Sequence, residues 1–96
     1  MSIIKKFLED AIPKFVKPTN KAFLGTNWFW EMYPDGSGSL ERKTKKGYET
    51  YFTYDKKPYL AEGGIEYDFK NKEHGVYVGS FEDFIEFAEE QVANLI

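Results

Sequence analysis

A succession of short aromatic segments, each bounded by turn residues, occupies the middle of the chain and constrains its fold most. The segments read AFLGTNWFWEMY, SLERKT, YETYFTYD, IEYDFK and VYVGS. Aromatic residues make up 19% of the chain, and aromatic and β-branched residues favour strands, whereas Gly, Pro, Asn and Asp favour turns. Segments of this length and spacing predict an antiparallel meander of four or five strands.

The best-marked turn lies in residues 33–44, YPDGSGSLERKT. Its centre, DGSGSLE, is similar to a calcium-binding EF-hand loop. Aligning Gly38 with the invariant glycine of that loop puts Tyr33 first and Thr44 twelfth, where the strongest ligands, Asp and Glu, are required. Residues 34–36, Pro-Asp-Gly, are instead typical of a type I turn closed by a glycine bulge. We therefore predict a hairpin here and no metal site.

Apolar periodicity predicts a helix at the N-terminal end. After Ser2, a good N-cap, apolar residues recur at steps of three and four: Ile4, Phe7, Leu8, Ala11, Ile12 and Phe15. Pro13 lacks the N–H that a helix interior needs, so the helix is expected to end or kink near Ala11 or Ile12. Pro18 opposes any continuation beyond Lys17.

A second helix is predicted to begin after Ser80, where SFED resembles a capping box with Asp83 at the third position. Its apolar arc consists of Phe81, Phe84, Ile85, Ala88, Val92, Leu95 and Ile96. Its polar side is expected to present Glu82, Asp83, Glu86, Glu89 and Glu90. Because an amphipathic helix must bury its apolar stripe, we predict an α+β fold in which an N-terminal and a C-terminal helix pack on one face of the antiparallel sheet. Residues 1–96 are predicted to form a single domain.

Alternation along the strands assigns side chains to two faces of the sheet. The face toward the helices is expected to hold Ile65, Tyr67 and Phe69; Val76 and Val78; Tyr48, Phe52 and Tyr54; and Trp28, Trp30 and Met32. The open face is expected to show Phe29, Tyr33, Tyr51 and Tyr77 among charged residues. Exposed aromatic groups of this kind can form a binding surface, although tyrosines on open sheets also simply pair across strands.

Composition excludes several classes of function. The chain has no cysteine, which excludes thiol catalysis, disulfides and thiolate zinc sites. Charged residues interrupt the apolar N-terminal segment, so neither a signal peptide nor a membrane span is predicted, and a cytoplasmic location is expected. His74 is the only histidine and falls in a predicted loop without a visible partner. With no phosphate loop, dinucleotide fingerprint or hydrolase motif, we expect no enzyme activity and no cofactor.

Charge is distributed unevenly, and this asymmetry points to a partner. The net charge is −3, but residues 62–90 carry nine acidic residues against two lysines, a net −7. The acidic helix face, with Glu82, Glu86, Glu89 and Glu90, is therefore a candidate surface for a protein with a basic face. A solvated face that maintains solubility is the alternative interpretation. Tyr51 and Tyr77 are further candidate contacts on the open sheet face.

The segment GSFEDFIEFAEE resembles the end of some small bacterial toxin-immunity proteins, in which a strand leads into SFxxF and a helix. In format, as a small, acidic, Cys-free and Tyr-rich chain, the protein also resembles phage-encoded inhibitors of bacterial defence, the anti-CRISPR proteins among them. These resemblances imply a non-catalytic inhibitor that binds a protein partner, or an immunity protein.

A single-stranded nucleic-acid or small-ligand binder is a hypothesis of another class, using Tyr51, Tyr77 and the basic residues of 42–57. The acidic composition argues against nucleic acid. A homodimer through the aromatic face is a third hypothesis.

Overall fold

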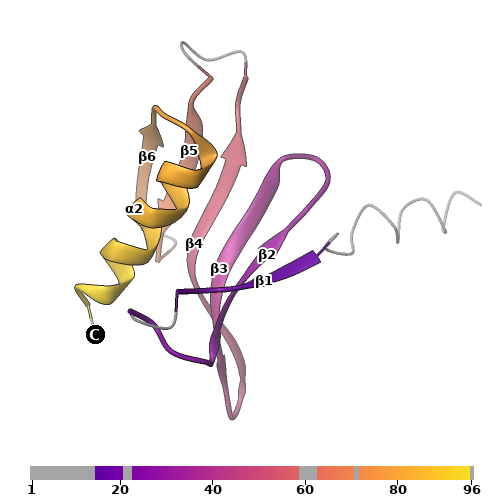
Figure 1. The fold of residues 1–96 in the computed structure, drawn as a ribbon, viewed down its shortest axis with the longest axis vertical. Coiled ribbons are helices and arrows are strands. Elements are labelled where there is room, and N and C mark those ends of the chain that lie inside the picture. The colour runs from indigo at the N-terminus through magenta and orange to yellow at the C-terminus, as the bar shows by residue number, and fades with distance from the viewer. Residues whose placement is uncertain (1–14, 21–22, 59–62, 71, 96) are drawn as a thin grey trace, which may run out of the picture.

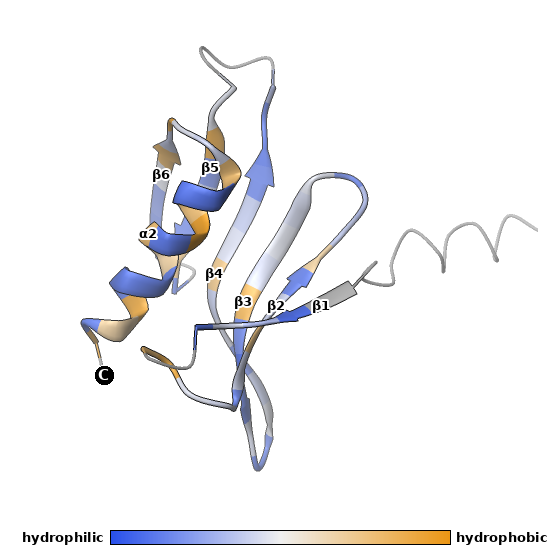
Figure 2. Ribbon diagram, in the orientation of Figure 1, coloured by the Kyte–Doolittle hydropathy of each residue, from blue (hydrophilic) through white to orange (hydrophobic). Residues whose placement is uncertain are grey.

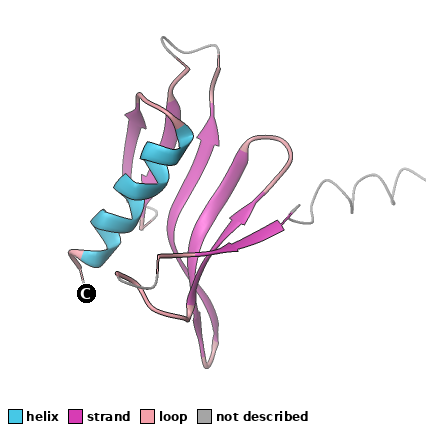
Figure 3. Ribbon diagram, in the orientation of Figure 1, coloured by secondary structure: helices cyan, strands magenta, loops and turns pink. Residues whose placement is uncertain are grey.

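The structure is a computed structural model that describes residues 15–20, 23–58, 63–70 and 72–95. These residues form one antiparallel sheet of six strands in the order β1-β2-β3-β4-β5-β6, with one helix, α2, lying across one face (Figures 1 and 3). The elements are β1 (Phe15–Pro18), β2 (Trp28–Met32), β3 (Ser37–Thr44), β4 (Gly47–Lys56), β5 (Ile65–Phe69), β6 (Glu73–Tyr77) and α2 (Phe81–Ala93). The predicted meander and C-terminal helix are confirmed.

The strand count is higher than predicted because β1 forms where the sequence indicated the end of a helix. Phe15 was expected on an apolar helix stripe, but it pairs with Met32, and Pro18 pairs with Phe29. β1 is an edge strand of the sheet, and an edge tolerates a proline that cannot donate to the ladder. The rest of the predicted N-terminal helix lies outside the described residues.

The β2–β3 hairpin follows the turn chemistry of its sequence. Gly36 adopts φ of +96°, its N–H donates to the Tyr33 carbonyl at 3.2 Å, and the Tyr33 N–H donates to Ser37 at 2.9 Å. The Asp35 carboxylate accepts from the Ser37 hydroxyl at 2.6 Å and from the Ser37 N–H at 2.9 Å, which lowers the pKa of Asp35. This carboxylate is therefore engaged within the turn, and the predicted hairpin is confirmed.

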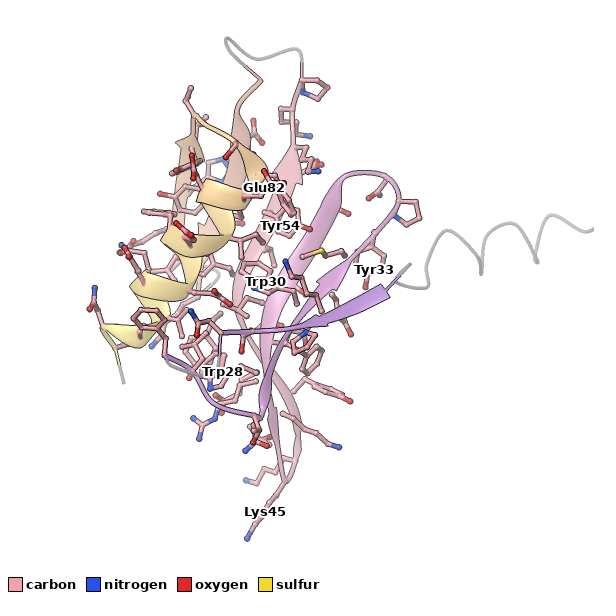
Figure 4. All side chains as sticks on the ribbon, viewed as in Figure 1. Trp28, Trp30, Tyr33, Lys45, Tyr54 and Glu82 are labelled. Atoms are coloured by element: carbon pink, nitrogen blue, oxygen red, sulfur yellow. The ribbon has the colours of Figure 1, made fainter. Side chains whose placement is uncertain are left out.

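The core lies between α2 and the sheet, where Trp30 and Tyr54 are seen in Figure 4. The largest fully buried side chains are Trp30, Leu40, Phe52, Phe84 and Val92. Blue and orange bands alternate along α2 in Figure 2, as expected for an amphipathic helix. The Ser80 hydroxyl accepts from the Asp83 N–H at 3.1 Å and caps the helix as predicted.

The face predicted for Tyr48 is wrong, because β3 and β4 pair with a β-bulge between them. Leu40 pairs with Phe52 but Glu41 pairs with Thr50, so Tyr51 is an extra residue without a partner in β3. An extra residue reverses the alternation of the preceding part of its strand. Tyr48 was predicted to share a face with Phe52, but its ring instead contacts Phe29 on the open face, at a centroid distance of 5.4 Å.

The faces predicted for Tyr77, Val76 and Val78 are also wrong. Tyr77 pairs with Ile65 and its ring contacts Phe84 and Phe87 of α2, whereas Val76 and Val78 are 53% and 51% exposed. The reason is the register: Gly75 pairs with Tyr67, and the Tyr67 ring lies so close that a Cβ on Gly75 would be 2.8 Å from its hydroxyl oxygen. Val76 therefore lies on the open face of β6, and Val78 lies exposed in the segment that follows the strand.

Candidate functional site

Four carboxylates form an exposed face on α2: Glu82, Asp83, Glu86 and Glu90. Glu82 is seen near the start of the helix in Figure 4. The last turn of α2 has no basic residue. In the part of the chain that the structure describes, the ion pairs are Lys57–Asp55 and His74–Asp68, so none of these four carboxylates is neutralised by a contact with a cation. We call these four residues the carboxylate face.

Glu89 does not belong to this face, which corrects the sequence prediction. It is 7% exposed, and its Oε1 accepts from the Trp30 indole Nε1–H at 3.3 Å and from the Asn20 backbone N–H at 3.1 Å. On a helical wheel of about 100° per residue, Glu89 lies closest to the apolar arc of all the α2 carboxylates. It follows Ile85 by one turn, on the flank that faces β2, and supplies the acceptor that a buried indole N–H needs.

A groove runs beside the carboxylate face, between α2 and the first two strands. Its volume is about 390 Å³, and the residues that line it are Lys17, Met32, Phe81, Glu82, Ile85 and Glu86. Met32, Phe81 and Ile85 give it an apolar floor, while Glu82 and Glu86 place carboxylates on its helix wall. We call it the α2 groove.

A second hollow adjoins the α2 groove through Glu86. It has a volume of about 250 Å³ and is lined by Asn20, Phe23, Glu86, Glu89 and Glu90. Phe23 is 53% exposed, so a large apolar side chain remains in contact with water beside these carboxylates. The two hollows together offer apolar surface next to the carboxylates of α2, with Lys17 on the opposite wall of the α2 groove.

Tyr51 and Tyr77 are not brought to the carboxylate face, nor do they lie on the open face as predicted. Tyr51 is half-buried against Trp28, at a centroid distance of 4.7 Å, and Lys70 Nζ lies 5.4 Å from its ring centroid. Tyr77 stacks on Phe87 at 5.2 Å, beneath the helix. Both rings are therefore packed against the core.

The open face carries two other arrangements of titratable groups. His74 lies in β6, not in a loop, and its Nδ1 is 2.7 Å from Asp68 Oδ1 at a hollow of about 230 Å³ that Asp55 and Glu66 also line. This gives His74 the partner that its sequence context did not indicate. On β2, burial and then the neighbouring Glu41 carboxylate raise the pKa of Glu31.

Among the described residues, no three His, Asp or Glu side chains come close enough to hold a metal ion. The His74–Asp68 pair is largely open to solvent, with the two side chains 66% and 42% exposed. Such a pair can orient the imidazole ring, but neither side chain is enclosed by the fold.

Comparison with models of protein families found no match. The searches of curated proteins and of solved structures likewise found no matching protein and no matching structure. No helix formed by the described residues is long and apolar enough to cross a membrane. The fold defines the chain as an α+β protein with a six-stranded antiparallel meander and a C-terminal helix.

The helix pattern in the sequence predicted the exposed carboxylates of α2, but nothing in it indicated the groove beside them. Lys17 and Met32 reach the groove through pairing of β1 with β2, and that strand was not predicted. The only available signal was the segment FVKP after the predicted helix, whose β-branched residue and edge-compatible proline permit a short strand.

Proposed function

We propose that this protein is a non-catalytic binding protein whose carboxylate face and α2 groove engage a basic, partly apolar surface of a protein partner. The observation that carries the proposal is a set of exposed carboxylates, which form no ion pair with any cation among the described residues, beside an apolar-floored groove. Glu82, Glu86 and Glu90 follow one another at one-turn intervals, and like charges at this spacing destabilise a helix by about 0.2–0.5 kcal/mol per pair. A cationic partner would remove that repulsion.

The apolar floor of the α2 groove adds surface that a partner can bury on binding. Exposed carboxylates alone steer a partner and accelerate encounter, whereas burial of apolar side chains contributes most of the binding free energy. Phe23 and the α2 groove offer that apolar component next to the acidic residues. A partner segment with Lys or Arg side chains flanking an apolar anchor would match both features.

An inhibitor of a nucleic-acid-handling enzyme is the most concrete form of this proposal. Such an enzyme presents a positively charged channel to nucleic acid, and an acidic face that occupies this channel would exclude the substrate. A toxin-immunity protein would act by the same chemistry on a toxin with a basic active-site surface. Both versions predict that the carboxylate face is buried in the complex.

The test compares capture of a host protein by wild-type protein and by the triple variant Glu82→Lys, Glu86→Lys and Glu90→Lys. The control carries the same change in net charge on β5 and β6, through Glu66→Lys, Asp68→Lys and Glu73→Lys. We expect the wild type and the control to retain the same partner and the α2 variant to lose it. Equal retention by all three proteins would contradict the proposal, as would equal loss by both variants.

A further inference from the structure

The β3–β4 hairpin concentrates the basic residues of the described chain at one end of the sheet. Figure 1 shows that the hairpin extends beyond the neighbouring strands, and Lys45 is at its tip in Figure 4. The exposed cations at the turn end of the hairpin are Arg42, Lys43, Lys45 and Lys46. None of them takes part in the two ion pairs formed by the described residues. A hollow of about 480 Å³ lies among Asn27, Arg42, Lys43, Thr44 and Lys45.

The turn between β5 and β6 adds cations next to this hairpin. Lys70 and Lys72 line a second hollow, of about 340 Å³, together with Glu49, Thr50 and Tyr51 of β4. Counting Glu49 and Glu73 against the six cations leaves a net charge of +4 at this end of a chain whose total is −3. Charge is therefore unevenly distributed, with positive charge at this end of the sheet and negative charge on α2 and β5.

An exposed aromatic ring accompanies these cations. The bulge at Tyr51 turns Tyr48 onto the open face beside Lys43, its partner in β3. Tyr48 is 61% exposed and meets Phe29 edge-on at a centroid distance of 5.4 Å. Arg42 and Lys70 lie against Trp28 and Tyr51, with their cationic groups 5.8 Å and 5.4 Å from the ring centroids, which holds these two cations close to the sheet.

We infer that the basic β3–β4 hairpin, with Tyr48, is a second binding surface, which takes single-stranded nucleic acid. Exposed cations on a protruding hairpin can contact the phosphates of a single strand, and the exposed Tyr48 ring beside Lys43 offers a stacking platform for a base. A double helix would not use Tyr48, since its bases are already stacked. The inference does not rest on the proposed function, because the carboxylate face takes no part in it.

This surface differs from the one that the sequence indicated. Tyr51 and Tyr77 were the predicted stacking residues, but both pack against the core, and Tyr48 occupies the open face instead. Lys70 and Lys72 come from a turn that is distant in sequence, and they line a hollow beside β4. No property of the sequence alone places Lys70 and Lys72 beside the hairpin.

The test measures anisotropy of a fluorescein-labelled oligothymidylate of twenty nucleotides on titration with the full chain. We expect binding at micromolar protein in about 20 mM salt, with log K falling against log salt at a slope near −3 if about four phosphates are neutralised. Lys45→Glu with Lys46→Glu should abolish binding, while Lys17→Glu with Lys56→Glu, which changes the net charge equally, should change the affinity less than threefold. Tyr48→Phe should preserve affinity, and Tyr48→Leu should weaken it about tenfold through loss of stacking.

Three results would overturn the inference. The first is absence of binding at 20 mM salt by a wild-type protein whose circular dichroism shows it to be folded. The second is an equal loss of affinity in the two charge-reversed double variants, which would attribute binding to total charge. The third is displacement of the oligonucleotide by poly-glutamate at equal charge concentration, since this would assign the hairpin to acidic protein segments in general.

Discussion

Replacing Glu89 with Ala is predicted to destabilise the protein by about 2 kcal/mol, although the residue was assigned to a solvated face by its sequence pattern. The magnitude follows from its two hydrogen bonds. Trp30 is fully buried, and a buried donor without an acceptor costs about 1–3 kcal/mol. The bond to the Asn20 N–H contributes less, because Asn20 is exposed to water. The substitution also removes a buried carboxylate, whose transfer out of water is unfavourable, and this offsets part of the loss.

Urea denaturation followed by tryptophan fluorescence measures this effect. For a chain of this size, about 2 kcal/mol corresponds to a fall in Tm of roughly 8–16 °C. Glu89→Gln keeps an acceptor oxygen and should cost less than half as much. Glu90→Ala, one residue further along on the carboxylate face, is the matched control and should change stability by no more than about 0.5 kcal/mol. Equal effects of the two alanine substitutions would refute the assignment of Glu89 as a buried acceptor.

Three further predictions concern stability. Gly38→Ala should destabilise the protein by about 1–3 kcal/mol in thermal denaturation, because a Cβ would collide with the Glu31 carbonyl and the Tyr54 hydroxyl; an unchanged Tm would contradict this packing. Burial, and then Glu41, raise the pKa of Glu31 in the fold, so the folded state binds this proton more tightly and loses stability as the pH rises through that pKa. Glu31→Gln should therefore raise Tm by about 2–4 °C at pH 7, and a gain that persists undiminished near pH 4 would exclude this cause. Burial raises the pKa of Tyr54 to about 12, so stability should fall as the pH rises above about 10, and the step near pH 12 in an ultraviolet tyrosine titration should be absent from Tyr54→Phe.

The parts of the fold with strong local signals were predictable from the sequence. The turn at residues 34–36, the cap at Ser80 and most of the apolar arc of α2 each depend on residues within a few positions of one another. Leu95 was predicted on that arc, but it lies beyond the helix and is 50% exposed. Alternation also placed Trp28, Trp30 and Met32 correctly, because β2 has no bulge. These features need no knowledge of which strands meet.

The errors arose from contacts between different strands, or between the sheet and α2. Tyr48 changed face because of a bulge that only the pairing of β3 with β4 defines. Tyr77 turned inward because Gly75 accommodates the ring of Tyr67. Glu89 is buried because an indole N–H fifty-nine positions away needs an acceptor. A helix or strand pattern read alone contains none of these partners.

The proposed function depends most directly on how fast the captured partner associates with the carboxylate face. The decisive measurement is the association rate constant as a function of salt for the wild type, the α2 triple variant and the β5–β6 control. At low ionic strength we expect the α2 variant to associate about 10- to 1,000-fold more slowly than the wild type. The control should stay much closer to the wild type, and the gap should narrow at about 1 M salt, where the Debye length falls to about 3 Å. Rate constants for the α2 variant and the wild type that coincide at every salt concentration would contradict the proposed role of α2.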